Sequence, residues 1–235
     1  MNQARDSDAF VAAYAGKPAQ YYAGARADFV ALLPVAPEAV LLDVGCATGG
    51  TGGLALAERK CGRFVGIELM EAAAKKAREV SSEIIVGNIE HMELQFPDET
   101  FDVVILSEVL EHLAWPGLVL KKIGPKMKPG GIVLASSPNI AHWKIVRDLL
   151  RGKFDPTDFG IMDRTHLRWF TPVTYQAMFS DAGYDVERVF PMRTLKGSKR
   201  VLAAITGRPT LFWPQICLAA RWPGLRAVGS KKERS

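Results

Sequence analysis

A glycine-rich loop and a carboxylate downstream of it are the residues of this chain best suited to do chemistry. The apolar run at 40–44 contains Asp43 and breaks into small residues between Gly45 and Gly49. Glycine is needed where a ligand presses against bare backbone at the exit of a buried strand. Glu68 ends the next apolar run, about 20 residues further on, where a carboxylate can bind both hydroxyls of a ribose. Together they predict a site for a nucleoside.

The spacing inside the loop narrows the choice of ligand. The glycines form the pattern Gly45-x-x-x-Gly49-Gly50, which departs from the G-x-G-x-x-G pattern that wraps a pyrophosphate. No lysine follows the loop to hold phosphates, as it would in a P-loop. A nicotinamide or flavin enzyme is the alternative, because such enzymes also combine a glycine loop with a later acid. The spacing favours a nucleoside cofactor without a diphosphate.

Five motifs between residues 40 and 137 together resemble the class I S-adenosylmethionine-dependent methyltransferases. The first motif of that family is similar to residues 42–49, and its ribose-binding acid falls at Glu68. The later motifs are 87–89, 101–112 and 128–131, in the family's order. The resemblance implies S-adenosyl-L-methionine as cofactor, bound by Asp43, Gly45, Cys46, Ala47, Gly49, Glu68, Leu69, Asn88, Ile89, Ser107 and Glu108.

Alternating strands and helices must position these motifs. We expect strands at 40–44, 64–68, 84–87, 103–107, 132–136 and 184–190, and helices at 51–60, 71–80, 117–127, 140–150 and 172–182. The alternation predicts a parallel sheet covered on both faces. The resemblance adds a last antiparallel strand within 211–220. Pro214 should mark its beginning, because proline has no amide hydrogen to donate. The predicted fold class is α/β, with a doubly wound, mostly parallel seven-stranded sheet and a Rossmann-like methyltransferase topology.

The chain is expected to divide into three parts. Residues 1–39 form an N-terminal helical lid, 40–222 form the methyltransferase domain, and 223–235 form a basic tail. The domain contains an insertion at about 138–170. After the helix expected at 140–150, residues 151–160 have turn-forming sequence and no clear period, which is where a substrate loop would lie. The residues expected to contact the acceptor or to close over it are Tyr21, Tyr22, Asn139, Asp163 and Arg168.

Two histidines are placed to act as general bases. His112 follows the exit of the fourth strand, on the side of a doubly wound sheet where ligands bind. His166 lies in a segment similar to one in methyltransferases of glycan and small-molecule pathways. Either imidazole could remove a proton from an acceptor hydroxyl, or could simply anchor its own loop. Asp155, Asp158, Asp163 and His166 of the insertion could together bind a divalent metal, but their spacing matches no known metal loop, so no metal is expected.

Composition limits the remaining possibilities. The chain has 235 residues, 48% of them hydrophobic, and its polar first residues lack the apolar segment of a signal peptide. The three widely separated cysteines are expected to be reduced, and the location to be cytoplasmic. Residues 193–235 carry ten lysines or arginines and one acid. This segment is either a solvated extension or a contact with phosphate, on an anionic membrane surface or a soluble substrate. Nucleic acid is not expected, and the oligomeric state is unknown.

These observations predict a methyltransferase that acts on a hydroxyl of a small molecule, most plausibly a saccharide or its nucleotide- or lipid-linked form. The first alternative is methylation of nitrogen or carbon in a small metabolite or a quinone-like ring. The second is an accessory protein that binds the cofactor for a partner enzyme, because the fourth strand and residues 137–143 resemble accessory proteins of methionine biosynthesis. Fold alone does not specify the acceptor.

Overall fold

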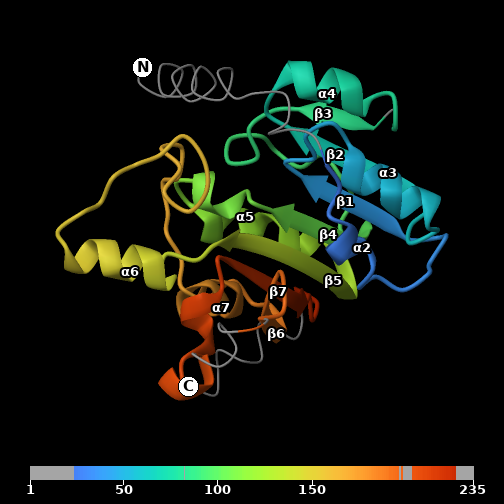
Figure 1. The fold of residues 1–235 in the computed structure, drawn as a ribbon. Helices are drawn as coiled ribbons and strands as arrows, with labels where there is room; N and C mark the ends of the chain where they lie inside the picture. Colours follow the sequence, from blue (N-terminus) through green and yellow to red (C-terminus); the bar gives the residue numbers. More distant parts are fainter. Residues whose placement is uncertain (1–23, 82, 196, 198–202, 226–235) are drawn as a thin grey trace.

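The computed structural model describes residues 24–81, 83–195, 197 and 203–225. Its centre is a seven-stranded sheet with the order β3-β2-β1-β4-β5-β7-β6 (Figure 1). Strands β1 to β5 run parallel, and β7 lies antiparallel between β5 and β6. The strands are β1 (Val40–Val44), β2 (Arg63–Glu68), β3 (Ile84–Val86), β4 (Phe101–Ser107), β5 (Met127–Pro138), β6 (Asp185–Pro191) and β7 (Gln215–Arg221). The predicted fold class is confirmed.

Helices cover both faces of the sheet because neighbouring strand residues point to opposite sides. On one face, Leu42 and Leu106 pack with side chains of α5 and α7. On the other, Leu41 and Ile105 pack with side chains of α2, α3 and α4. The helices are α2 (Ala27–Val30), α3 (Gly50–Ala57), α4 (Glu71–Ala77), α5 (Pro116–Ile123), α6 (Trp143–Leu150) and α7 (Pro172–Asp181), with 3-10 turns at η2 (Leu110–His112), η3 (Gly124–Lys126) and η4 (Pro209–Phe212).

Most predicted elements are present, and the differences lie at their ends. Helix α7 begins at Pro172, as predicted, and the Thr171 hydroxyl caps it by accepting a hydrogen bond from the Thr174 amide. Strand β7 begins at Gln215, directly after Pro214, but the preceding residues form η4 instead of strand. Helix α6 begins at Trp143, later than predicted. Strand β5 is longer than predicted, because Met127 already pairs with Phe101.

Helix α6 stands out from the body of the molecule (Figure 1), and none of its residues is buried. It belongs to the predicted insertion between β5 and α7. No helix among the described residues is long and apolar enough to cross a membrane. Tyr21 and Tyr22 of the predicted lid, and residues 226–235 of the predicted tail, lie outside the described residues. The three-part division of the chain stays a prediction.

Candidate active site

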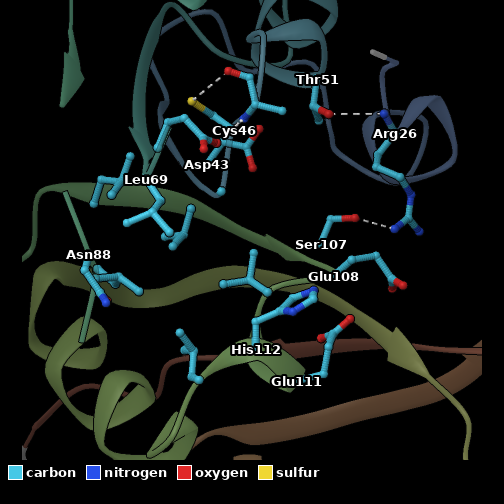
Figure 2. A pocket seen from close by; sticks show the side chains of 18 of the residues that line it. Arg26, Asp43, Cys46, Thr51, Leu69, Asn88, Ser107, Glu108, Glu111 and His112 are labelled. Atoms are coloured by element: carbon cyan, nitrogen blue, oxygen red, sulfur yellow. Dashed lines mark hydrogen bonds between the residues drawn. The ribbon is translucent and has the colours of Figure 1, made fainter. Parts of the chain in front are cut away.

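A cavity of about 480 Å³ lies at the carboxyl ends of the parallel strands β1, β2 and β4. This is the edge of a doubly wound sheet at which ligands bind. The exit loops of four strands contribute to its wall (Figure 2). The insertion contributes Gly160, Asp163 and His166. The predicted site residues that line it are Asp43, Gly45, Cys46, Ala47, Glu68, Leu69, Asn88, Ile89, Ser107, Glu108, His112, Asp163 and His166.

The glycines of the first loop are required by the backbone. Gly45 has a φ of 71°, and a Cβ there would lie 2.6 Å from Cγ2 of Val109. Gly49 has a φ of 80° and forms the N-cap of α3, next to the cavity lining. Residues that carry a side chain rarely adopt this left-handed backbone conformation. Cys46 lies between them, and burial raises the pKa of its thiol, which argues against a thiolate nucleophile.

Two buried acids form the floor of the cavity near this loop. The Glu68 carboxylate accepts hydrogen bonds from the amides of Ala47 and Met70, both at 2.8 Å. Burial raises the pKa of Glu68 above its ordinary value. Burial, with the neighbouring charge of Glu68, raises the pKa of Asp43 to about 8. The cavity therefore favours a cationic ligand, which would stabilise both carboxylates in their ionised form.

Arg26, which directly precedes α2, lines the cavity and joins three segments of the chain, a role that the sequence does not reveal. Its guanidinium donates to the hydroxyls of Ser107, at 2.5 Å, and Ser136, at 2.6 Å, and pairs with Asp28. Its backbone amide donates to the Thr51 hydroxyl at the start of α3. Only the structure reveals the role of this arginine, because its partners are distant in the sequence.

We expect Arg26→Met to lower the melting temperature by about 4–8 °C. The side chain is 14% exposed and its loss leaves two hydroxyls and Asp28 without their cation, which should cost about 2 kcal/mol. Differential scanning calorimetry measures this effect. Arg63→Met is the control, since Arg63 pairs with Glu83 at an exposed position where the loss should be below about 1 kcal/mol. Equal shifts in the two variants would contradict the role assigned to Arg26.

A second group of polar side chains follows the exit of β4. The 3-10 turn η2 places Glu111 and His112 against the insertion, and Figure 2 shows them on the side of the cavity away from Asp43. The imidazole of His166 lies beside that of His112, with ring centroids 4.8 Å apart. Glu111 is 1% exposed, and burial together with the charge of Glu108 raises its pKa well above the ordinary range.

Glu111 was not among the predicted site residues, although the sequence contains a signal for it. In the pattern Glu108-x-x-Glu111-His112, Glu111 and His112 follow Glu108 by three and four residues, the spacings at which a helical turn brings a side chain next to that of Glu108. Glu108 accepts hydrogen bonds from Ser136 and Gln215, at 2.9 and 2.5 Å. These contacts fix Glu108 next to the turn.

Of the predicted residues that the structure describes, three do not line the cavity. Gly49, the N-cap of α3, lies next to the lining and is not part of it. Asn139 is fully buried, and its amide donates to the carbonyls of Thr210 and Trp213, which fastens the end of β5 to η4. Arg168 donates to the Ala114 carbonyl from an exposed position. Asp163 does line the cavity, and it accepts hydrogen bonds from the amide and hydroxyl of Thr165.

Comparison with known proteins gives a consistent family assignment. A family model described as a methyltransferase domain matches residues 18–189. The chain is 30% identical to the ubiquinone/menaquinone biosynthesis C-methyltransferase UbiE of Hydrogenovibrio crunogenus over 145 residues, which cover 57% of this chain and 54% of that protein. It is 38% identical to the demethylmenaquinone methyltransferase of Bacillus licheniformis over 122 residues, which cover 48% and 52%. The chain spans about half the length of these curated relatives.

The fold is shared with solved structures. A methyltransferase structure from Archaeoglobus fulgidus, described as dependent on S-adenosylmethionine, aligns with a TM-score of 0.60 at 20% identity and covers 86% of this chain and 96% of its own. At that identity the likeness shows the fold alone. The family model, which spans the loop of β1, both acids and both histidines, carries the assignment. This chain belongs to the methyltransferase domain family, within the class I S-adenosylmethionine-dependent methyltransferases.

Proposed function

We propose that the protein transfers the methyl group of S-adenosylmethionine to a hydroxyl of a small molecule. The observation that carries the proposal is the buried cluster of Glu111, His112 and His166 on the wall of the cavity that also contains the glycine loop. An oxygen acceptor must lose its proton as the new bond forms, and imidazoles and carboxylates are the groups that assist this loss. The acceptor class stays a proposal.

The residues of the cavity fit the cofactor. S-adenosylmethionine carries a sulfonium, an ammonium and a ribose, and the cavity offers two buried carboxylates and exposed backbone at the β1 loop. We place the ribose hydroxyls at Glu68, whose oxygens keep lone pairs beyond those used by the amides of Ala47 and Met70. We place the amino-acid end beside Asp43, Gly45 and the nearby Gly49.

The cofactor, when bound, supplies an activated methyl group with its own leaving group. The protein then has to hold the acceptor oxygen in line with that methyl group and to exclude water. Arg26 lines one side of the cavity, and the insertion contributes Gly160, Asp163 and His166 to another. The polar side chains of Arg26, Asp163 and His166 suit an acceptor with several hydroxyls, such as a saccharide.

Methylation of a quinone-like ring is the second candidate, because the two curated relatives described above are named for such reactions. The cluster at η2 is compatible with it. Removal of a proton from a phenolic hydroxyl increases the electron density of the ring, and a ring carbon can then attack the methyl group. That carbon afterwards loses its own hydrogen as a proton, which restores the aromatic ring. Both candidates begin with loss of a hydroxyl proton, and they differ in this second proton loss, in the atom methylated and in the shape of the acceptor.

The decisive experiment uses cofactor with an isotopically labelled methyl group and panels of saccharides, nucleotide-linked sugars and hydroquinones. We expect label in a product, and mass spectrometry with NMR identifies the atom that carries it. An oxygen atom supports the proposal, and a ring carbon supports the second candidate. Tight cofactor binding with no transfer to any acceptor, alone or with an added partner enzyme, would instead indicate an accessory protein.

We expect Glu68→Ala to weaken S-adenosylmethionine binding by about 1–3 kcal/mol, or roughly 5- to 150-fold, because a charged hydrogen-bond partner of the ribose is lost. Isothermal titration calorimetry measures the change. Glu79→Ala is the control, since Glu79 is exposed at the end of the α4 segment and away from the cavity lining. Unchanged affinity in Glu68→Ala would contradict the placement of the ribose.

A further inference from the structure

We propose that Glu111, His112 and His166 form a binding site for a divalent first-row transition-metal ion. Each residue offers one ligand atom, and these atoms all lie within 4.8 Å of one another. All three residues are buried, at 1%, 6% and 7% exposure, and all three line the cavity. The sequence predicts no metal, because the ligands come from η2 and from a distant segment of the insertion.

Hydrogen bonds to backbone carbonyls set both histidines in the tautomer that binds metals. Nδ1 of His112 lies 3.1 Å from the Thr165 carbonyl oxygen, and Nδ1 of His166 lies 3.1 Å from that of Ile161. A carbonyl oxygen has no proton to give, so each Nδ1 must carry one. A neutral imidazole then has its lone pair at Nε2. Such carbonyl partners are the usual support of metal-binding histidines.

The Glu111 carboxyl group supplies an independent indication. Neither of its oxygens has a hydrogen-bond partner among the described residues, although both are buried. The Ser137 hydroxyl lies close enough to oppose the rise in the pKa of Glu111, but neither it nor the Tyr175 hydroxyl makes a hydrogen bond of regular geometry. Burying a polar group without a partner is costly, and buried polar groups nearly always have one. A cation between Glu111 and the two imidazoles would provide the missing partner.

The ligand types select the class of ion. Magnesium and calcium prefer oxygen ligands throughout, whereas two imidazoles with a carboxylate suit zinc, manganese, iron or cobalt. Ligands about 2.1 Å from one ion lie at most about 4.2 Å apart. The widest separation in the cluster therefore has to shrink by at least about half an ångström when the ion binds. The carboxylates of Glu108 and Asp163 contribute further negative charge around Glu111.

The role of the ion rests on the proposed function, whereas the site itself does not. The cluster lines the cavity, so an ion there would hold the acceptor's hydroxyl and lower its pKa. The O–H bond then breaks and its proton passes to water. The oxygen forms a bond with the methyl carbon, and the sulfur keeps the electron pair of the broken C–S bond. The imidazoles would act as ligands in this case and not as bases.

The test is a titration of untagged, chelator-treated protein with Co²⁺ and Zn²⁺, without cofactor or acceptor. We expect binding of one ion per chain by calorimetry, and visible absorption bands of Co²⁺ in a nitrogen and oxygen environment. Glu111→Gln and His166→Ala should each weaken binding about 10- to 100-fold. His91→Ala is the control, because His91 is exposed and outside the cluster. Melting temperatures of all variants show whether they fold.

Several outcomes would overturn the site. One is the absence of binding at millimolar Co²⁺, and another is equal affinity in Glu111→Gln, His166→Ala and His91→Ala. If His166→Ala fails to fold, Glu111→Gln alone decides, because it keeps the shape of the side chain. Methyl-transfer assays then separate the two proposals. Metal binding without transfer to any acceptor would contradict the proposed function but not the metal site. Methyl transfer that a chelator does not reduce would show that the ion takes no part in the reaction.

Discussion

Replacing His112 or His166 by alanine is expected to lower turnover about 10²-fold or more, with cofactor affinity nearly unchanged. Both imidazoles lie on the cavity wall, and their rings are 4.8 Å apart. Whether they act as bases or as ligands of an ion, they assist the loss of the acceptor's proton, and general acid–base catalysis contributes effects of this size. Neither ring is placed at the ribose or the amino-acid end of the cofactor.

Steady-state kinetics with the acceptor that the labelled-methyl experiment identifies, together with calorimetric titration of the cofactor, measures both parts of this prediction. His91→Ala is again the matched control and should keep full turnover. If both cavity variants keep full turnover as well, the reaction depends on positioning alone. If the variants lose cofactor affinity in proportion to turnover, the histidines support the cofactor site instead of the acceptor.

The sequence predicts the strands of this fold well, because each strand is a short apolar run that ends in turn-forming residues. Strand β1 and its loop are the clearest case. The positive φ angles of Gly45 and Gly49 are local backbone requirements, and they can be recognised from residue type. The cofactor side of the cavity is built from such strand exits, so most of the residues predicted there line the cavity.

The acceptor side could not be predicted in the same way, because its contacts join distant segments. His112 meets the backbone of Thr165, and Leu167 donates its amide to the Glu111 carbonyl. Nothing in the local sequence pairs η2 with the insertion. Arg26 is a second case, since its partners Ser107 and Ser136 lie on two central strands. Asn139 is the reverse case. Its position at a strand exit predicts contact with the acceptor, but its side chain joins β5 to η4 by donating to the carbonyls of Thr210 and Trp213.

The two buried acids of the cavity, Asp43 and Glu68, have different environments, and this difference makes the stability of the protein depend on pH. Glu68 shares its charge with two backbone amides, whereas Asp43 is 3% exposed and lies beside another carboxylate. Burial and the charge of Glu68 raise the pKa of Asp43 to about 8. Because this value lies above that of an unfolded chain, near 3.9, the stability gained from protonated Asp43 is present at low pH and is lost as the pH rises toward 8.

We therefore expect S-adenosylmethionine to bind more tightly as the pH rises from about 5.5 to 7.5, by up to about tenfold per pH unit. The ammonium that we place beside Asp43 favours its ionised form, so binding below pH 8 must release the Asp43 proton. Calorimetry in two buffers of different ionisation enthalpy measures this release directly. In Asp43→Asn, which has a similar shape and no titrating group, the affinity should be lower and nearly independent of pH. The same pH dependence in Asp43→Asn would show that another group titrates. Above pH 8 the gain should end, because the amino group of the cofactor itself loses its charge near that pH.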